Sequence, residues 1–324
     1  MEEAYNDDPQ CIGVIPPEDR NRTTSDFDGD GRTDLVWRNT SNGRNVVWLM
    51  DGPTRTGSGD TIPINNPDWH LAGFGDFDGD GHADFLWRSV STGRNVIWFM
   101  DGYNRLAAAD TLSLNDPDWE LAGLDDFNGD GMTDFLWRNL RNGRNVVWFM
   151  DGHSRIGAGD TLSVNDPAWM LAGLADFNGD GRTDFLWRNV NNGRNVIWLM
   201  DGVNRIAHGD TIVLNDSDWS LAGLRDFNGD GTADFLWRSA STGRNVMWFM
   251  DGTQRSGHGD ALSLNNPDWL LAGFGDFNGD TRTDMLWHHT VSGRNVMWFM
   301  YGKNRASAAD AQPLSFDPWY LYIK

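Results

Sequence analysis

A nine-residue acidic loop near the start of the chain has the residue types and spacing that bind a hard metal ion. It runs from Asp26 to Asp34 and places carboxylates at loop positions 1, 3, 5 and 9. The main-chain carbonyl at position 7, here Arg32, can add another oxygen. Calcium takes about six to eight oxygen ligands, whereas magnesium keeps more of its waters. The loop therefore predicts a calcium site. An EF-hand is excluded, because its final position needs Glu and this chain has Trp37 there.

This loop recurs six times at a constant spacing of 50 residues. A single copy would be an ordinary Asp/Gly turn, but six copies with the same ligand spacing predict six calcium sites. Position 3 is Asp in the first two loops and Asn in the other four, and both supply an oxygen. With the position 7 carbonyl included, the predicted ligands are Asp26, Asp28, Asp30, Arg32, Asp34, Asp76, Asp78, Asp80, His82, Asp84, Asp126, Asn128, Asp130, Met132, Asp134, Asp176, Asn178, Asp180, Arg182, Asp184, Asp226, Asn228, Asp230, Thr232, Asp234, Asp276, Asn278, Asp280, Arg282 and Asp284.

The sixth loop is expected to bind calcium most weakly. Position 6 is glycine in five loops and Thr281 in the sixth. If the loop needs a positive φ at this position, a β-branched residue is costly there.

The charge of the chain agrees with cation binding. Asp and Glu number 47 against 26 Lys and Arg, so the formal net charge is -21. Nucleic acid and anionic membrane surfaces are therefore not expected as partners. No apolar run approaches the roughly 20 residues of a membrane helix, so membrane insertion is not expected. Cys11 is the single cysteine, so no intrachain disulfide can form.

Short strands must position the metal loops, because each repeat alternates apolar segments with turn sequences. In one repeat unit we expect strands at 69–75, 84–88, 95–100 and 111–114. The second and third strands are apolar at both alternating sets of positions, which predicts a sheet packed on both faces. The first strand contains Ala72 and Gly73, which suit a crowded centre where sheets converge.

These features predict an all-β fold, a six-bladed β-propeller of four-stranded antiparallel blades. A solenoid is the less favoured alternative. The repeats are expected at 25–74, 75–124, 125–174, 175–224, 225–274 and 275–324, after an N-terminal arm of residues 1–24. The first repeat lacks its own first strand. Residues 319–324 are a surplus copy of that strand, so we expect them to complete the first blade and close the ring.

The metal motif and the Leu-Ala-Gly-x-x-Asp-Phe sequence before it resemble the FG-GAP/VCBS repeat across residues 25–324. This repeat occurs in integrin α-chain propellers, in secreted bacterial proteins and in a fungal propeller lectin. The resemblance implies calcium in each loop and a secreted or cell-surface location. It does not transfer one function, because such repeats serve adhesion, sugar binding and attachment to enzymes.

A recognition role is expected rather than catalysis, because no asymmetric cluster of acid, base or nucleophile breaks the repeat. His288 and His289 replace a recurrent Arg-Asn/Ser pair, which indicates a relaxed end repeat. Glycan is the leading ligand, because one tryptophan per repeat follows a turn and could stack on sugars at a rim. These candidates are Trp69, Trp119, Trp169, Trp219, Trp269 and Trp319. Packing between blades is the competing interpretation for them.

Other functions remain open at this stage. The recurrent Arg94 and Asn95 could bind a ligand, although pairing of the arginine with a carboxylate is favoured. The chain could instead be a structural or adhesive subunit of a surface layer or filament, assembling through its N-terminal arm. It could also be a non-catalytic propeller attached to a secreted enzyme, or bind an extracellular protein.

Overall fold

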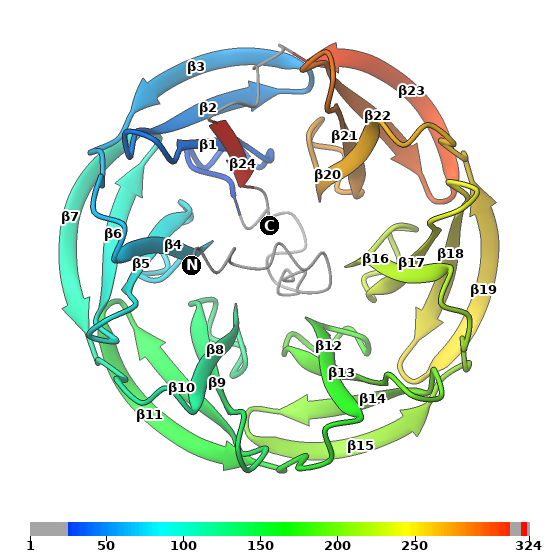
Figure 1. The fold of residues 1–324 in the computed structure, drawn as a ribbon, viewed down its shortest axis with the longest axis horizontal. Coiled ribbons are helices and arrows are strands. Elements are labelled where there is room, and N and C mark those ends of the chain that lie inside the picture. Colours follow the sequence, from blue (N-terminus) through cyan, green and yellow to red (C-terminus); the bar gives the residue numbers. More distant parts are fainter. Residues whose placement is uncertain (1–24, 312–318, 323–324) are drawn as a thin grey trace.

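Six four-stranded antiparallel sheets surround a common centre in the computed structural model, which describes residues 25–311 and 319–322 (Figure 1). The N-terminal arm lies outside the described residues. We number the blades by their order around the ring. Blade 1 is β24-β1-β2-β3, and blades 2 to 6 are β4–β7, β8–β11, β12–β15, β16–β19 and β20–β23. The predicted six-bladed propeller is confirmed.

Each blade repeats the same four layers from the centre outwards. The innermost strands are β4 (Trp69–Gly75), β8 (Trp119–Asp125), β12 (Trp169–Ala175), β16 (Trp219–Arg225), β20 (Trp269–Gly275) and β24 (Trp319–Tyr322). The second strands are β1 (Leu35–Asn39), β5 (Asp84–Ser89), β9 (Asp134–Asn139), β13 (Asp184–Asn189), β17 (Asp234–Ser239) and β21 (Asp284–His289). The third strands are β2 (Asn45–Asp51), β6 (Asn95–Asp101), β10 (Asn145–Asp151), β14 (Asn195–Asp201), β18 (Asn245–Asp251) and β22 (Asn295–Tyr301).

The outermost strands are β3 (Thr54–Asp60), β7 (Asn104–Thr111), β11 (Ser154–Thr161), β15 (Asn204–Asp210), β19 (Gln254–Ala261) and β23 (Asn304–Ala311). The prediction of a fourth strand at 111–114 was wrong. Gly102, with φ of 59°, turns the chain directly after β6, and β7 begins at Asn104. Most of β7 is exposed, so it lacks the apolar alternation on which the prediction relied. Among the described residues, no helix has the length and apolar character needed to cross a membrane.

The core lies between adjacent blades, as the two apolar faces of the middle strands predict. One cluster joins Phe27, Val36 and Val47 of blade 1 to Phe85 and Trp87 of blade 2, together with several of their neighbours. Burying large aromatic side chains of this kind contributes about 1.5 to 3 kcal/mol each. Small residues are required at the centre. A Cβ atom added to Gly123 would lie 2.2 Å from Leu174 Cδ1 of the next blade.

The C-terminal strand completes blade 1, as predicted. β24 pairs antiparallel with β1, with Leu321 opposite Trp37 and Trp319 opposite Asn39. Blades 1 and 6 also share an apolar cluster that includes Trp37, Trp48 and Phe277, so side chains close the ring as well as backbone.

Candidate metal centres and inter-blade cavities

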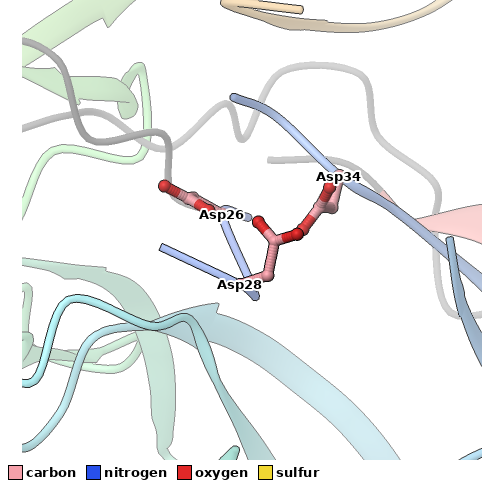
Figure 2. Close-up of side chains that lie close together, drawn as sticks. All are labelled: Asp26, Asp28 and Asp34. Carbon is pink, nitrogen blue, oxygen red and sulfur yellow. The ribbon is translucent and has the colours of Figure 1, made fainter. Parts of the chain in front are cut away.

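Loops two to six each connect the innermost strand of a blade to its second strand, whereas the first loop directly precedes β1, the second strand of blade 1. In the first loop one carboxylate oxygen from each of Asp26, Asp28 and Asp34 lies within 4.8 Å of the others (Figure 2). Asp76, Asp78 and Asp84 form the same group in the second loop. Within the described part of the chain, the predicted carboxylates at positions 1, 3 and 9 therefore converge in both loops that carry Asp at position 3.

The carboxylate at position 1 organises the turn. Asp26 Oδ1 accepts the backbone N–H of Gly29 at 2.8 Å, and Oδ2 accepts that of Gly31 at 2.8 Å. The predicted ligand at position 5, Asp30, is not in the close group. Its Oδ1 instead accepts the N–H of Arg32 at 2.9 Å, a bond that recurs in all six loops.

The carboxylate at position 9 is buried and joins the loop to the third strand of its blade. Asp34 accepts the N–H of Phe27 and the N–H of Met50, both at 2.8 Å. The same two bonds form in every repeat, at 2.7–3.3 Å. Burial raises the pKa of this carboxyl group to about 8 in all six loops, although the two N–H donors oppose the shift.

Loops three to six use Asn at position 3 differently. Asn128 Nδ2 donates to Asp130 Oδ2 at 2.8 Å, and Asn128 Oδ1 accepts the N–H of Asp130 at 2.9 Å. Asn178 makes the same pair of bonds, as do Asn228 and Asn278. The amide therefore connects positions 3 and 5, where the first two loops have a carboxylate at position 3.

The first loop fits calcium by its donor chemistry. Its converging side chains offer only oxygens, which is the set that a hard cation prefers. Asp28 Oδ1 is buried and has no hydrogen-bond donor, and burial with the nearby charge of Asp30 raises the pKa of Asp28. A cation would satisfy that oxygen. Asp26, Asp28 and Asp34 would hold it, with the Arg32 carbonyl as the predicted main-chain ligand.

The position 7 side chains vary between loops and contact the preceding blade. His82 Nδ1 lies 2.8 Å from the Phe27 carbonyl oxygen, and a Cβ atom added to Gly29 would lie 3.2 Å from the His82 ring. Met132, Arg182, Arg282 and Arg32 cover the corresponding glycines of their preceding loops. Because the side chains at position 7 differ so much in chemistry, the expected metal ligand at this position is the main-chain carbonyl and not the side chain.

Backbone bonds also connect five of the six metal loops to the next blade. The N–H of Ala83 donates to the carbonyl of Asp26 at 2.6 Å, and the N–H of Gly102 donates to the carbonyl of Phe27 at 2.7 Å. Across the closure of the ring, the N–H of Thr33 donates to the carbonyl of Asp276 at 2.8 Å. A metal ion that orders one loop would therefore also order a contact between two blades.

Position 6 has a positive φ in every loop, between 84° and 101° where it is glycine and 68° at Thr281. Thr281 is the one non-glycine residue with a positive φ in the described chain. Thr281→Gly is expected to stabilise the protein by about 1 kcal/mol and to tighten the sixth site. Calcium titration by calorimetry, with Gly231→Thr as the reverse substitution in loop five, measures both effects. Six sites of equal affinity, unchanged by either substitution, would refute the ranking.

The calcium-free protein is expected to become more stable as the pH falls from 8 towards 5. The position 9 carboxyl groups have a folded pKa of about 8, above the ordinary value of 3.8, so the cost of burying their charge is greatest above pH 8. Protonation relieves this cost progressively below pH 8. Melting temperatures in chelator across this range provide the measurement. Calcium affinity should fall over the same range, because protons and the ion compete.

The rim opposite the metal loops carries the predicted tryptophan positions. β5 leads from Asp84 in the metal loop to Ser89, and Trp69 pairs with Ser89 at this far end. Arg94 follows the next turn, and its guanidinium carbon lies 5.6 Å from the Trp69 ring centroid. Equivalent Arg–Trp contacts form at Trp119, Trp169, Trp219 and Trp269. The Trp319 side chain lies outside the described residues.

A cavity of about 380 Å³ lies beside this contact, between blades 1 and 2. Its lining residues are Pro63, Ile64, Asn65, Asn66, Trp69, Trp87, Arg94, Val96 and Trp98. Arg94 also pairs with Asp110 through two contacts of 2.7 Å, so the favoured carboxylate pairing is confirmed. The indole N–H of Trp87 is buried and has no acceptor. A second cavity of about 310 Å³ on blade 1 is lined by the counterparts Trp37, Arg44, Val46 and Trp48, among others.

Two other recurrent residues have structural roles. Asn95 is buried, accepts from Arg88 Nη1 at 2.9 Å and donates to the Leu112 carbonyl. The Arg88 guanidinium lies 4.8 Å from the ring centroid of Trp137 in the next blade. In blade 6, His288 replaces this arginine and its Nδ1 lies 2.7 Å from Asn295 Oδ1. The sequence did not lead us to predict this structural role for Arg88 and its counterparts in the other repeats. Their recurrence directly before Ser or Asn was the feature that could have indicated it.

Comparisons with known proteins support the same repeat. The sequence model of the FG-GAP-like repeat matches residues 26–87, 126–187, 176–237 and 226–287, which together cover more than half of the chain. No curated protein sequence matches the chain. A chain of the nidogen/laminin complex is similar in structure, with a TM-score of 0.52 and 13% identity over 89% of this chain and 96% of that chain. A chain of the Photorhabdus luminescens Tc holotoxin pore has a TM-score of 0.54 and 16% identity over 83% of this chain and 14% of that chain. At these identities the likeness shows the fold alone.

Proposed function

This chain belongs to the FG-GAP-like repeat family, and we propose that it is a calcium-stabilised propeller that binds glycans. It acts outside the cell as a recognition module rather than as an enzyme. The location follows from the metal. Extracellular calcium modules bind with dissociation constants of about 10⁻⁴ to 10⁻³ M, so loops of this class fill outside cells and empty in the cytosol.

The cavity between blades 1 and 2 carries the proposal. Ligand sites are concave, largely apolar, and contain a few polar groups that orient the ligand. Trp69 supplies half-buried aromatic surface, Trp87 and Trp98 line the cavity as buried side chains, and Arg94 supplies a charged group. The Trp87 N–H is a buried donor without an acceptor. A sugar fits this combination, because its C–H face stacks on an indole while its hydroxyl oxygens accept hydrogen bonds.

Repetition makes such a site effective. The Arg–Trp contact recurs in five described blades on the same rim of the ring. Weak equivalent sites on one rigid ring gain avidity on a surface that displays the ligand repeatedly. The expected partner is therefore a glycan-coated surface, with little affinity for a single free sugar.

Glycan-array binding in calcium tests this function. The intact protein is expected to retain a defined group of glycans, and replacement of Trp69, Trp119, Trp169, Trp219 and Trp269 by Ala should reduce binding at least tenfold. The triple variant Leu106→Ala, Ile156→Ala and Ile206→Ala is the matched control. It removes exposed aliphatic side chains from the outermost strands, outside the cavity linings, and should leave binding unchanged.

A single substitution provides a second test, in case the fivefold variant does not fold. Trp169→Ala should lower the number of sites measured by calorimetry by one, with the melting temperature in calcium recorded alongside. Absence of any retained glycan, or binding that survives all five substitutions in a folded ring, would contradict the proposal. A structural or protein-binding role would then be favoured.

A further inference from the structure

Position 3 divides the six metal loops into two classes. It is Asp28 and Asp78 in loops one and two, and Asn in loops three to six. Within the described part of the chain, three carboxylates converge within 4.8 Å in loops one and two, and Figure 2 shows this group in loop one. Because Asn is neutral, loops three to six carry one negative charge fewer among the predicted ligands.

The position 3 side chain also has different hydrogen bonds in the two classes. In loop four, Asn178 Oδ1 accepts the N–H of Asp180 at 3.1 Å, and Asn178 Nδ2 donates to Asp180 Oδ2 at 3.0 Å. The amide therefore neutralises part of the position 5 carboxylate without a cation. In loop one, by contrast, Asp28 Oδ1 is buried and accepts no hydrogen bond. Loop one thus has a buried negative oxygen that a cation would compensate.

Loop one belongs to the blade that closes the ring. Loops two to six each follow an innermost strand whose last residue pairs with position 9, as Gly75 pairs with Asp84. Loop one instead directly precedes β1, and the innermost partner of β1 is β24, from the other end of the chain. The carbonyl of Asp26 in this loop accepts the N–H of Ala83 in blade 2. An ion in loop one would therefore order the joint between the closing blade and its neighbour.

We propose that the six calcium sites fill in two steps, loops one and two at a lower calcium concentration than loops three to six. The inference rests on the proposed calcium binding and ranks the sites within it. Calcium affinity depends on the number of charged ligands, and a fourth carboxylate is expected to lower the dissociation constant of a site about tenfold. The first step orders blades 1 and 2, and the second step completes the ring at higher calcium.

Titration with calcium alone, followed by calorimetry, tests the two steps. The intact protein is expected to have two sites with dissociation constants about tenfold below those of the other four. The double variant Asp28→Asn and Asp78→Asn should lose the tight class and keep six sites. Asn128→Asp should add a third tight site. Each change installs a residue that other loops carry at position 3, so the fold should tolerate it.

Asp116→Asn is the matched control. Asp116 is exposed and lies just before β8, on the rim opposite the metal loops. The substitution removes one negative charge and installs the residue found at position 66, so neither class of site should change. Melting temperatures in calcium are recorded for every variant. If Asn128→Asp does not fold, Asn178→Asp makes the same change in loop four.

Hydrogen exchange at calcium concentrations between the two steps gives a structural readout. The N–H groups of Ala83 and Thr133 donate to carbonyls in loops one and two. Those of Thr183 and Ala233 donate to carbonyls in loops three and four. The first pair should become protected from exchange at the lower calcium concentration, and the second pair only at the higher one.

Two results would overturn the two-step filling while calcium binding itself stands. One is six equivalent sites that neither kind of substitution changes, and the other is simultaneous protection of all four N–H groups. A protein that binds calcium in none of its loops would overturn the proposed function together with this inference.

Discussion

In excess chelator the propeller is expected to melt at a far lower temperature than in millimolar calcium. At a tenfold excess over the dissociation constant, one site contributes about 1.4 kcal/mol. Six such loops would contribute roughly 8 kcal/mol, which is comparable to the whole stability of an ordinary domain. Without the ion, the ionised position 9 carboxyl group of each loop, such as Asp34, carries a burial cost that its two N–H donors only partly offset.

Scanning calorimetry measures this effect, and reversal by added calcium is its control. Magnesium at the same concentration should restore less, because it needs stricter octahedral geometry and retains its waters. The loop contacts with adjacent blades predict that calcium loss weakens the ring as a unit rather than one turn at a time. An unchanged melting curve in excess chelator would falsify the calcium assignment.

Deletion of residues 319–324 is expected to destabilise the ring by about 3 to 5 kcal/mol, from roughly 1 kcal/mol per lost ladder hydrogen bond and the burial of Leu321. The deletion removes β24 and leaves β1 as an open edge, with Trp37 no longer covered by its strand partner Leu321. An uncovered edge strand also invites pairing with another molecule.

Urea unfolding in calcium, with light scattering, measures both consequences. Leu321→Ala is the matched control, because it removes the partly buried side chain and keeps the strand, and it should cost about 1 to 2 kcal/mol. The opposite result would be a filament of the intact protein that the deletion dissolves into equally stable propellers. In that case the strand would belong to a neighbouring molecule, and the structural-subunit function would be favoured.

The local pattern of the sequence determined the number of blades and most strands. The 50-residue period and the apolar residues of the second and third strands predicted six sheets packed on both faces, because residues buried on two sides must be apolar on both sets of positions. Glycine at position 6 likewise predicted a positive φ, which Thr281 shares. The outermost strand escaped prediction, because solvent-exposed strands such as β7 carry little apolar signal.

Only the tertiary structure decided how distant residues combine. Asp34 accepts the N–H of Met50 because β1 and β2 pair in one register, and the cavity beside Trp69 is lined in part by Ile64, from the connection between β3 and β4. Spacing alone grouped Asp30 with the other predicted ligands, and the structure adds that its Oδ1 accepts the Arg32 N–H within the turn. The local sequence pattern determines which residues of a segment are buried, whereas packing between blades determines which residues they contact.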